Sequence, residues 1–567
     1  MTVLNVYGSS KNAKEPKFPK TAFSPQVGFA WDVFGNGKTS VRGGFYLSYE
    51  MNIFNNTLFD EFSRIPPGIG PTALSFDFVV GPDGKPIDVG GFPDGDYSAL
   101  QGQPIRNVLT TIGKVHQAVQ SAYSSFQFDP KKGPSEFENS RGVTFGGTFP
   151  GTYEIPYSMQ FTIGIQRELF PNHVISVDYV RNRGIGLPFL LGEFERRRDA
   201  RYLNAAAAAA NIASFLTNGC QGQTINQAIT NGCLNSQGKR FTPTIANFGQ
   251  ASDAVFTGLT PNLTRARLLT GGFSLYQGIQ VQLNGRLSSG QTDRLRFIKG
   301  LNYTISYALA RAEATNGSGR TEFINNTINN NSWNSSYGPT GNDRTSILGA
   351  GVLMDVPMGF RLSQLWSFRT APPQNLFVPF VDGFSSSNAM FTTDLNGSGG
   401  AGSSPQVDLL PGTNIGDFGR SIKSWKELNQ VISNFNSGFA GKLTPNGQAL
   451  VAAGLFTEAQ LRSLGATIKP IKLVPESNPW PFENFFNLDL RISRPIKVTE
   501  RFEFEPSVDI FNVFNNNSLG LYGGLAGNFG DLNFDYSDPA DKADLNKNIR
   551  LRQKNTRLLQ FGLRITF

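Results

Sequence analysis

The last eleven residues, Arg557 to Phe567, read Arg-Leu-Leu-Gln-Phe-Gly-Leu-Arg-Ile-Thr-Phe, and they decide which fold the chain can adopt. Apolar residues occupy one parity of this stretch: Leu559, Phe561, Leu563, Ile565 and Phe567. Polar or small residues occupy the other parity: Gln560, Gly562, Arg564 and Thr566. Because successive side chains of a strand point to opposite faces, the pattern predicts a strand with one apolar and one polar face. Such a strand suits the edge of a soluble core. It equally suits the wall of a transmembrane β-barrel, with lipid outside and a wet or plugged lumen inside.

The composition favours the membrane alternative. The chain is 39% hydrophobic, 12% aromatic and 17% charged, and it contains 62 Gly and 48 Phe. A transmembrane helix needs about 20 consecutive apolar residues, and the nearest candidate, the alanine run 205–210, is interrupted by Asn204 and Asn211. Barrel strands carry their apolar residues at alternate positions, so a low mean hydropathy is compatible with a barrel.

The net charge of +8 does not indicate a nucleic-acid partner. The basic residues are scattered, and the runs are as short as Arg196-Arg197-Arg198. Nucleic-acid binding requires a basic stripe or a known module, so we exclude that class. The charge suits solvated loops and a polar lumen, and it would also attract acidic lipopolysaccharide.

Two cysteines, Cys220 and Cys233, lie in the near-repeats Asn218-Gly219-Cys220 and Asn231-Gly232-Cys233. Structural zinc takes four ligands, and the two histidines, His116 and His173, lie far away in the sequence. We therefore expect no metal and no cofactor, and we predict a disulfide that closes a loop in an oxidising space. Closure of so short a loop is worth roughly 3 kcal/mol.

Short turns and long polar stretches alternate along the chain. The first predicted strands, about 25–33 and 41–49, meet at Phe34-Gly35-Asn36-Gly37-Lys38, and Asn-Gly is a strong hairpin signal. Later pairs of strands meet at short turns near 170–173, 288–294, 357–359 and 499. The long stretches cover about 50–154, 184–272, 310–345, 371–483 and 514–555, with short helices predicted at about 109–123 and 447–464.

This alternation predicts an all-β fold: an antiparallel transmembrane β-barrel of the outer-membrane type. Such barrels have short periplasmic turns and long extracellular loops, and about eleven predicted strands are long enough to cross a bilayer. A soluble β-propeller or a stacked sandwich would instead show a regular repeat of about 40 residues, and none is visible.

Several stretches resemble the barrel half of TonB-dependent receptors, in particular the Oar-like type with a carboxypeptidase-regulatory-like N-terminal domain. The stretches are Phe23-Ser24-Pro25-Gln26-Val27-Gly28-Phe29-Ala30-Trp31-Asp32, Arg42-Gly43-Gly44-Phe45, Tyr337-Gly338-Pro339 with Asp343-Arg344, and Asp509-Ile510-Phe511-Asn512-Val513-Phe514-Asn515. Thr345-Ser346 departs from the Arg-His that this type has after Asp-Arg. The ending, with Gln560, Gly562, Ile565 and Phe567, is similar to the C-terminal signal that the barrel assembly machinery recognises.

The resemblance implies a 22-stranded barrel with a plug, in the cell outer membrane of a Gram-negative-type bacterium. It also implies uptake of a nutrient, bound from outside, with energy supplied by TonB. The start of the chain shows no signal-peptide pattern, and neither a plug nor a TonB-contacting segment is found. We therefore expect 1–24 to be an extracellular loop remnant and 25–567 to be the C-terminal part of the barrel. Contact with TonB would run through a missing N-terminal part.

An incomplete barrel leaves two open edges, at the strands 25–33 and 557–567. We expect a curved open sheet, or a smaller distorted closure that joins these two strands.

Two other functions are compatible with the same barrel, and one class of function is not expected. A porin-like channel, or a surface adhesin built from the loops, would use the same barrel without energy coupling. An enzyme is not expected, because no Gly-x-Ser-x-Gly elbow stands out and lumen polarity explains paired carboxylates such as Glu503 and Glu505. The ligand is not identifiable. The loop residues Trp333, Trp425 and Trp480 could stack on sugars, but packing in a loop core or at a membrane interface is favoured for each.

Overall fold

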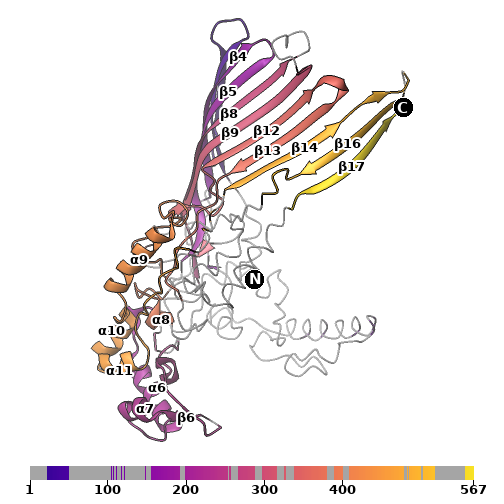
Figure 1. Cartoon of the computed structure of the whole chain (residues 1–567). Helices are drawn as coiled ribbons and strands as arrows, with labels where there is room; N and C mark the ends of the chain where they lie inside the picture. The colour runs from indigo at the N-terminus through magenta and orange to yellow at the C-terminus, as the bar shows by residue number, and fades with distance from the viewer. Residues whose placement is uncertain are drawn as a thin grey trace.

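A computed structural model shows one wide, curved sheet with a group of helices gathered at one end of its strands (Figure 1). The structure describes 22–49, 155–191, 198–235, 237–252, 266–287, 297–315, 337–379, 389–399, 408–477, 484–499, 502–516 and 556–567, together with a few shorter stretches. Most of the predicted helix at 109–123, most of the loop 50–154 and nearly all of the loop 514–555 lie outside the described residues. The described positions of that helix, Thr110, Gln117 and Ser121, are helical.

Eleven long strands follow one another through the sheet in chain order, each antiparallel to the next. They are β1 Gln26–Asp32, β2 Thr39–Tyr49, β4 Tyr157–Phe170, β5 His173–Leu191, β8 Ala266–Leu287, β9 Gly300–Thr315, β12 Ser346–Asp355, β13 Arg361–Arg369, β14 Phe485–Ser493, β16 Glu503–Phe511 and β17 Leu558–Thr566. Four short strands join this sheet: β3 Gly147–Thr148, β10 Asn325–Asn326, β11 Tyr337–Pro339 and β15 Ile496–Lys497. The order confirms the predicted antiparallel succession of membrane strands.

The sheet is open within the described residues. There β1 pairs with β2 alone and β17 pairs with β16 alone, so each presents one unpaired edge. The two edges stand well apart in Figure 1. This arrangement agrees with the expected curved open sheet rather than with a smaller closure.

The turn between β1 and β2 shows why the hairpin signal works. Gly35 and Gly37 have φ values of 65° and 71°, which side chains with a Cβ adopt at a cost. The Gly37 N–H donates to Asp32 Oδ2 at 2.7 Å, which ties the turn to the end of β1. Asn36 Oδ1 accepts from the Lys38 N–H at 3.0 Å. The local sequence therefore specifies the turn without help from the rest of the molecule.

Two long strands run further into the predicted loops than the sequence pattern suggests. β5 continues to Leu191 and β8 begins at Ala266, although 184–272 is predicted as loop, and β9 continues to Thr315. The main chains of β5 and β8 remain paired past irregularities near Leu187, with Phe189 opposite Leu269. Backbone hydrogen bonds between strands do not require side chains of alternating polarity. The alternation of apolar and polar residues therefore stops before the strands end.

Six helices whose bounds are described lie in the connections β5–β8 and β13–β14. They are α6 Ala205–Asn218, α7 Ile225–Asn231, α8 Ala389–Thr392, α9 Trp425–Gly438, α10 Pro445–Ala452 and α11 Glu458–Ser463. Short 3-10 turns lie at η3 Ala200–Tyr202, η4 Ile245–Phe248 and η6 Pro357–Gly359, and β6 Cys233–Leu234 pairs with β7 Arg240–Phe241. Among the described residues, none of the helices is both long and apolar enough to cross a membrane.

The helix predicted at 447–464 is in fact two helices. Gly454, with φ 70°, follows the end of α10, and Thr457 starts α11 with a capping box to Gln460. α9 was not predicted, although Ser424 caps its first turn by accepting from the Glu427 N–H.

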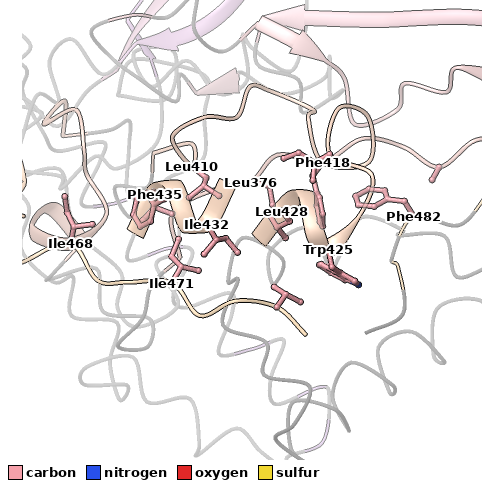
Figure 2. Close-up of a cluster of buried hydrophobic side chains, with 14 residues drawn as sticks. Leu376, Leu410, Phe418, Trp425, Leu428, Ile432, Phe435, Ile468, Ile471 and Phe482 are labelled. Atoms are coloured by element: carbon pink, nitrogen blue, oxygen red, sulfur yellow. The ribbon is translucent and has the colours of Figure 1, made fainter. Parts of the chain in front are cut away.

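We call the described residues within 198–256 and 371–482 the loop body. They form two large apolar cores and a small cluster at the disulfide. The first lies around α9 and contains Leu376, Phe418, Trp425, Leu428, Ile432 and Phe435 (Figure 2). The second brings Ala208 and Ile212 of α6 against Leu450 and Phe456 from the other connection. Two segments more than a hundred residues apart therefore share one core.

Candidate functional site

The outer face of the sheet is apolar across neighbouring strands. In register, Val41 lies opposite Ile165, Ile165 opposite Val177, Val177 opposite Val281, and Val281 opposite Tyr307. On the same face Ile163 is 43% exposed and Ile279 is 44% exposed. Water would penalise this arrangement, whereas lipid favours it.

The opposite face is polar and carries ion pairs between strands. Arg42 of β2 donates from Nη2 to Asp178 Oδ2 of β5 at 2.8 Å and from Nε to Oδ1 at 3.1 Å. The pair spans Gly164 of β4, where a Cβ would lie 2.0 Å from Asp178 Oδ1. The strand between the two partners must therefore carry glycine, and the Arg42-Gly43-Gly44 stretch is part of this structural network.

The carboxylates singled out in the sequence belong to this polar face. Ser493 Oγ donates to Glu505 Oε1 at 2.8 Å, and Glu503 lies opposite Thr566. Arg491 Nη2 donates to Asp509 Oδ2 at 2.9 Å. Glu505 and Asp509 thus have hydrogen-bond partners on the polar face.

The polar face is also the hollow face. A cavity of about 700 Å³ opens on it, between β5 and β13 and nearer the short turns. Its lining on this face includes Asn284, Arg286, Asn302, Thr304 and Ser363. A hollow polar face and an apolar outer face are the arrangement of a barrel wall around a polar lumen.

A junction joins the loop body to the end of β9, and Asp343 is its centre. The side chain of Asp343 is 4% exposed, and its carboxylate accepts from the Ala312 N–H at 2.7 Å and from Arg420 Nη2 at 3.2 Å. Arg420 Nη1 donates to the Ala371 carbonyl at 2.9 Å. A buried carboxylate needs such partners, so removing Arg420 would leave a buried charge without its ion pair.

The Tyr337-Gly338-Pro339 stretch completes the junction. A Cβ on Gly338 would lie 2.5 Å from the Ile415 side chain, so the loop body packs directly on the backbone here. The ring of Tyr337 stacks on Phe273 of β8 with centroids 4.7 Å apart. Tyr337, Gly338 and Asp343 thus hold the loop body against the ends of β8 and β9. At the departure Thr345-Ser346, Ser346 Oγ lies 3.1 Å from the Tyr307 hydroxyl.

Cys220 and Cys233 are joined by a disulfide with their Cα atoms 4.7 Å apart. The bond follows the end of α6 and connects it to β6, and both cysteines are fully buried beside Ala228. The structure therefore joins the two cysteines that the sequence predicts to be paired.

The loop tryptophans pack inside the loop body. Trp425 is 7% exposed and lies 5.2 Å from Trp480, centroid to centroid, and both rings contact Phe418. Figure 2 shows Trp425, Phe418 and Phe482 converging at one end of α9. Trp425 and Trp480 therefore pack in a loop core, which is the role that the sequence favoured for them. Trp333 lies outside the described part of the chain.

A pair of carboxylates, buried Asp394 and half-buried Asp408, was not found from the sequence. Burial, and to a smaller extent the nearby charge of Asp408, raise the pKa of Asp394 to about 8. Burial also raises the pKa of Asp408 to about 6, against the N–H groups of Asn396 and Leu395, which favour its charged form. Asn396-Gly397 signals a turn in the sequence, but nothing local indicates that Asp408 packs onto it.

No group of three or more His, Cys, Asp or Glu side chains is placed to hold a metal ion among the described residues. His173 is buried at the start of β5, with Nδ1 2.9 Å from the Pro171 carbonyl and its ring 4.0 Å from that of Phe170. Its contacts are those of packing. His116 lies outside the described residues.

The terminal strand β17 forms the last edge of the sheet. Phe561 lies opposite Val508 and Ile565 opposite Phe504, so its apolar parity continues the outer face. Gln560 lies opposite Asp509 on the polar face. Gly562 lies opposite Ser507, whose Oγ would be 2.6 Å from a Cβ at that position.

These features define the class. The model of a family described as "Outer membrane beta barrel domain" matches residues 6–367, and the chain belongs to this family. The protein is therefore an outer-membrane β-barrel protein, located in the outer membrane. No curated protein matches the sequence.

Three solved structures align with most of this chain at very low identity. The outer membrane transporter YddB from Escherichia coli is 8% identical with a TM-score of 0.32, over 87% of this chain and 37% of that one. The siderophore receptor PirA from Acinetobacter baumannii is 8% identical with a TM-score of 0.29, over the same shares of the two chains. A Pseudomonas aeruginosa ferric enterobactin receptor mutant, PfeA, solved with enterobactin, is 8% identical with a TM-score of 0.26, over 86% and 36%. The chain thus spans little more than a third of these proteins.

Proposed function

We propose that this chain is the barrel portion of a TonB-dependent receptor-transporter of the Oar-like type, which takes up a nutrient from outside the cell. The observation that carries the proposal is the loop body at the mouth of the sheet. It has two apolar cores and a buried ion pair to the wall, between Asp343 and Arg420. A diffusion pore needs no such folded body at its entrance, whereas a receptor that selects a ligand does.

The remaining parts of the proposal follow from the resemblance. The full barrel would have 22 strands, of which this chain supplies the C-terminal part, and a plug would fill the polar lumen. The ion-paired polar face, exemplified by Arg42 and Asp178, suits contact with a polar plug. TonB would act through that plug. The loops would lie outside the cell, the barrel assembly machinery would recognise the terminal strand, and lipopolysaccharide would surround the outer face.

The first test is the coding sequence upstream of Met1. A plug domain preceded by a TonB-contacting segment, in frame or in an adjacent gene, is the expected result. Neighbouring genes for glycosidases or peptidases would indicate the class of nutrient. An upstream sequence without a plug would favour the porin-like channel or the adhesin.

The second test measures energy coupling in cells that express the complete receptor. Binding of the nutrient should persist after the proton gradient is collapsed, whereas its accumulation should stop. A porin-like channel would accumulate or equilibrate the solute in both conditions. An adhesin would bind cells or surfaces and transport nothing.

A further inference from the structure

Three arginines lie side by side on the outer face of the sheet. In register, Arg181 of β5 lies opposite Gln277 of β8, and Gln277 lies opposite Arg311 of β9. In the next row away from the short turns, Arg183 lies opposite Leu275, and Leu275 lies opposite Glu313. All have the parity of the apolar outer face, because each is two or four residues from Tyr179, Ile279 or Leu309 on its own strand.

On β5 and β9 the apolar band gives way to charged residues at these arginines, whereas on β4 and β2 it continues, with Phe161 opposite Arg181 and Phe45 opposite Phe161. The row just below them, toward the short turns, consists of Tyr179, Ile279 and Leu309. Beyond them, toward the long loops, Tyr337 stacks on Phe273 and the loop body begins. In an outer-membrane barrel the long-loop end faces the cell exterior, so this border lies at the headgroups of the outer leaflet.

The charges of this cluster are exposed and, among the described residues, only partly neutralised. Arg181 and Arg183 are exposed, and the side chain of Arg311 is 61% exposed although its Nη2 lies 2.5 Å from Glu313 Oε1. Glu313 is 12% exposed, and its other oxygen accepts from the Tyr337 hydroxyl at 3.1 Å. Three guanidinium groups thus face one largely buried carboxylate.

We propose that Arg181, Arg183 and Arg311 form a binding site for the phosphate groups of lipopolysaccharide in the outer leaflet. A guanidinium group presents paired N–H donors that match the oxygens of a phosphate and hold it in two hydrogen bonds. The acyl chains of the lipid would lie on the apolar row below, at Ile279 and Leu309. The inference requires the outer-membrane location alone and holds for a transporter, a channel or an adhesin.

The test uses the complete receptor, purified from outer membranes and placed in lipid nanodiscs. The variant Arg181→Gln/Arg183→Gln/Arg311→Gln removes the three charges at the border and keeps hydrogen-bonding side chains. Arg167→Gln is the matched control, since Arg167 is exposed on the same face of β4 but lies at the short-turn end. The bound lipopolysaccharide is counted by mass spectrometry after delipidation and titration with purified lipopolysaccharide.

We expect the triple variant to bind lipopolysaccharide at least about tenfold more weakly, which is the effect of a loss of about 1.4 kcal/mol. Arg167→Gln should bind as the unaltered receptor does. Enzymatically dephosphorylated lipopolysaccharide should bind the receptor and the triple variant equally weakly. Inorganic phosphate alone should compete only at high concentration, because it lacks the acyl chains.

Equal binding by the triple variant and the receptor would overturn the proposal, and so would equal loss with Arg167→Gln. If the triple variant fails to assemble, the single variant Arg311→Lys answers the question. It keeps the charge and loses the paired donors, and it should weaken binding severalfold while the heat-modifiable barrel remains. An Arg311→Lys barrel that binds normally, together with unchanged binding by Arg181→Gln, would again refute the site.

Discussion

The membrane sheet and the loop body use the same residue types in opposite places. Phe561 of β17 is 79% exposed and Phe161 of β4 is 43% exposed, whereas Phe418 and Phe256 of the loop body are fully buried. Conversely, the sheet keeps the ion pair between Arg42 and Asp178 on its hollow polar face. One chain therefore contains a part that is apolar outside and a part that is apolar inside.

The difference teaches that the surrounding solvent decides where an apolar side chain goes. In water, apolar burial stabilises the loop body by roughly 25 cal/mol per Å² of area removed from solvent. In hydrocarbon that driving force is absent, and satisfaction of backbone hydrogen bonds determines the structure. Five substitutions would break or sharpen this contrast, and they follow from the largest expected effect to the smallest.

Deleting Phe567, or changing it to Asp, should remove most of the assembled barrel from the outer membrane. Phe567 is 95% exposed at the end of the apolar parity of β17, where the lipid-facing edge is completed. The measurement is the heat-modifiable band of the complete receptor in outer-membrane fractions. Thr566→Asp, one position away on the polar parity, is the control and should assemble far better. Undiminished assembly without Phe567 would refute the assembly role.

Leu428→Ala should destabilise the loop body by about 2–5 kcal/mol, because it opens a cavity in a packed core. Leu428 of α9 is fully buried, whereas Leu473 is 56% exposed. Leu473→Ala is therefore the matched control and should change stability by less than about 1 kcal/mol. Hydrogen exchange of the α9 amides in the detergent-solubilised receptor measures both. Equal effects would mean that the first core is not packed as Figure 2 shows.

Ile163→Arg should destabilise the sheet by about 1–3 kcal/mol, because a lipid-facing charge costs about 2–4 kcal/mol at the middle of a bilayer and less toward its interface. Ile163 lies opposite Tyr179, in the row below the arginine border. The adjacent Thr162 lies on the polar face, and Thr162→Arg should cost much less. Urea unfolding of the receptor from lipid vesicles gives the two free energies. A larger cost at Thr162 than at Ile163 would mean that the two faces are assigned the wrong way round.

Replacing Cys220 and Cys233 together by Ser should destabilise α7 and its neighbours locally by up to about 3 kcal/mol, through the greater freedom of the opened loop. Trypsin cleavage between 220 and 240 should become faster, whereas exchange in the first core around Leu428 should stay unchanged. The control is the receptor with both cysteines present, treated with a reducing agent. It should behave like the double variant. Thiol labelling of the non-reduced native receptor would contradict the disulfide.

Asp394→Asn should remove a pH dependence of the loop body. The folded protein holds a proton on Asp394 up to a pKa of about 8, whereas the unfolded chain releases it above the ordinary value of 3.8. The stability that this proton contributes is therefore full below about pH 4 and is lost as the pH rises toward about 8. Between about pH 6.5 and pH 7.5 the loss should be about 1 kcal/mol, and Asp394→Asn should show almost none. Hydrogen exchange near Gly399 at the two pH values provides the measurement. An equal slope in both proteins would mean that Asp394 is ionised in the folded state.

The sequence by itself determined the membrane wall. Alternation predicted the faces of β17 and of the strands before it, and Asn36-Gly37 predicted the first turn. It could do so because a strand repeats every two residues and a tight turn depends on four or five neighbours. Beyond Leu187, β5 remains a strand only because its backbone pairs with β8, and its side chains no longer alternate. The alternation therefore predicted too early an end for this strand.

Only the tertiary structure decided how the loops fold and where they attach. Asp343 meets Arg420 across 77 positions, and Asn446 Nδ2 donates to the Arg198 carbonyl across 248 positions. Such contacts depend on which distant segment packs against the residue. A sequence pattern that repeats every few residues carries no information about that. The same holds for the raised pKa of Asp394, because burial and the approach of Asp408 are created by the fold and not by the residues beside it.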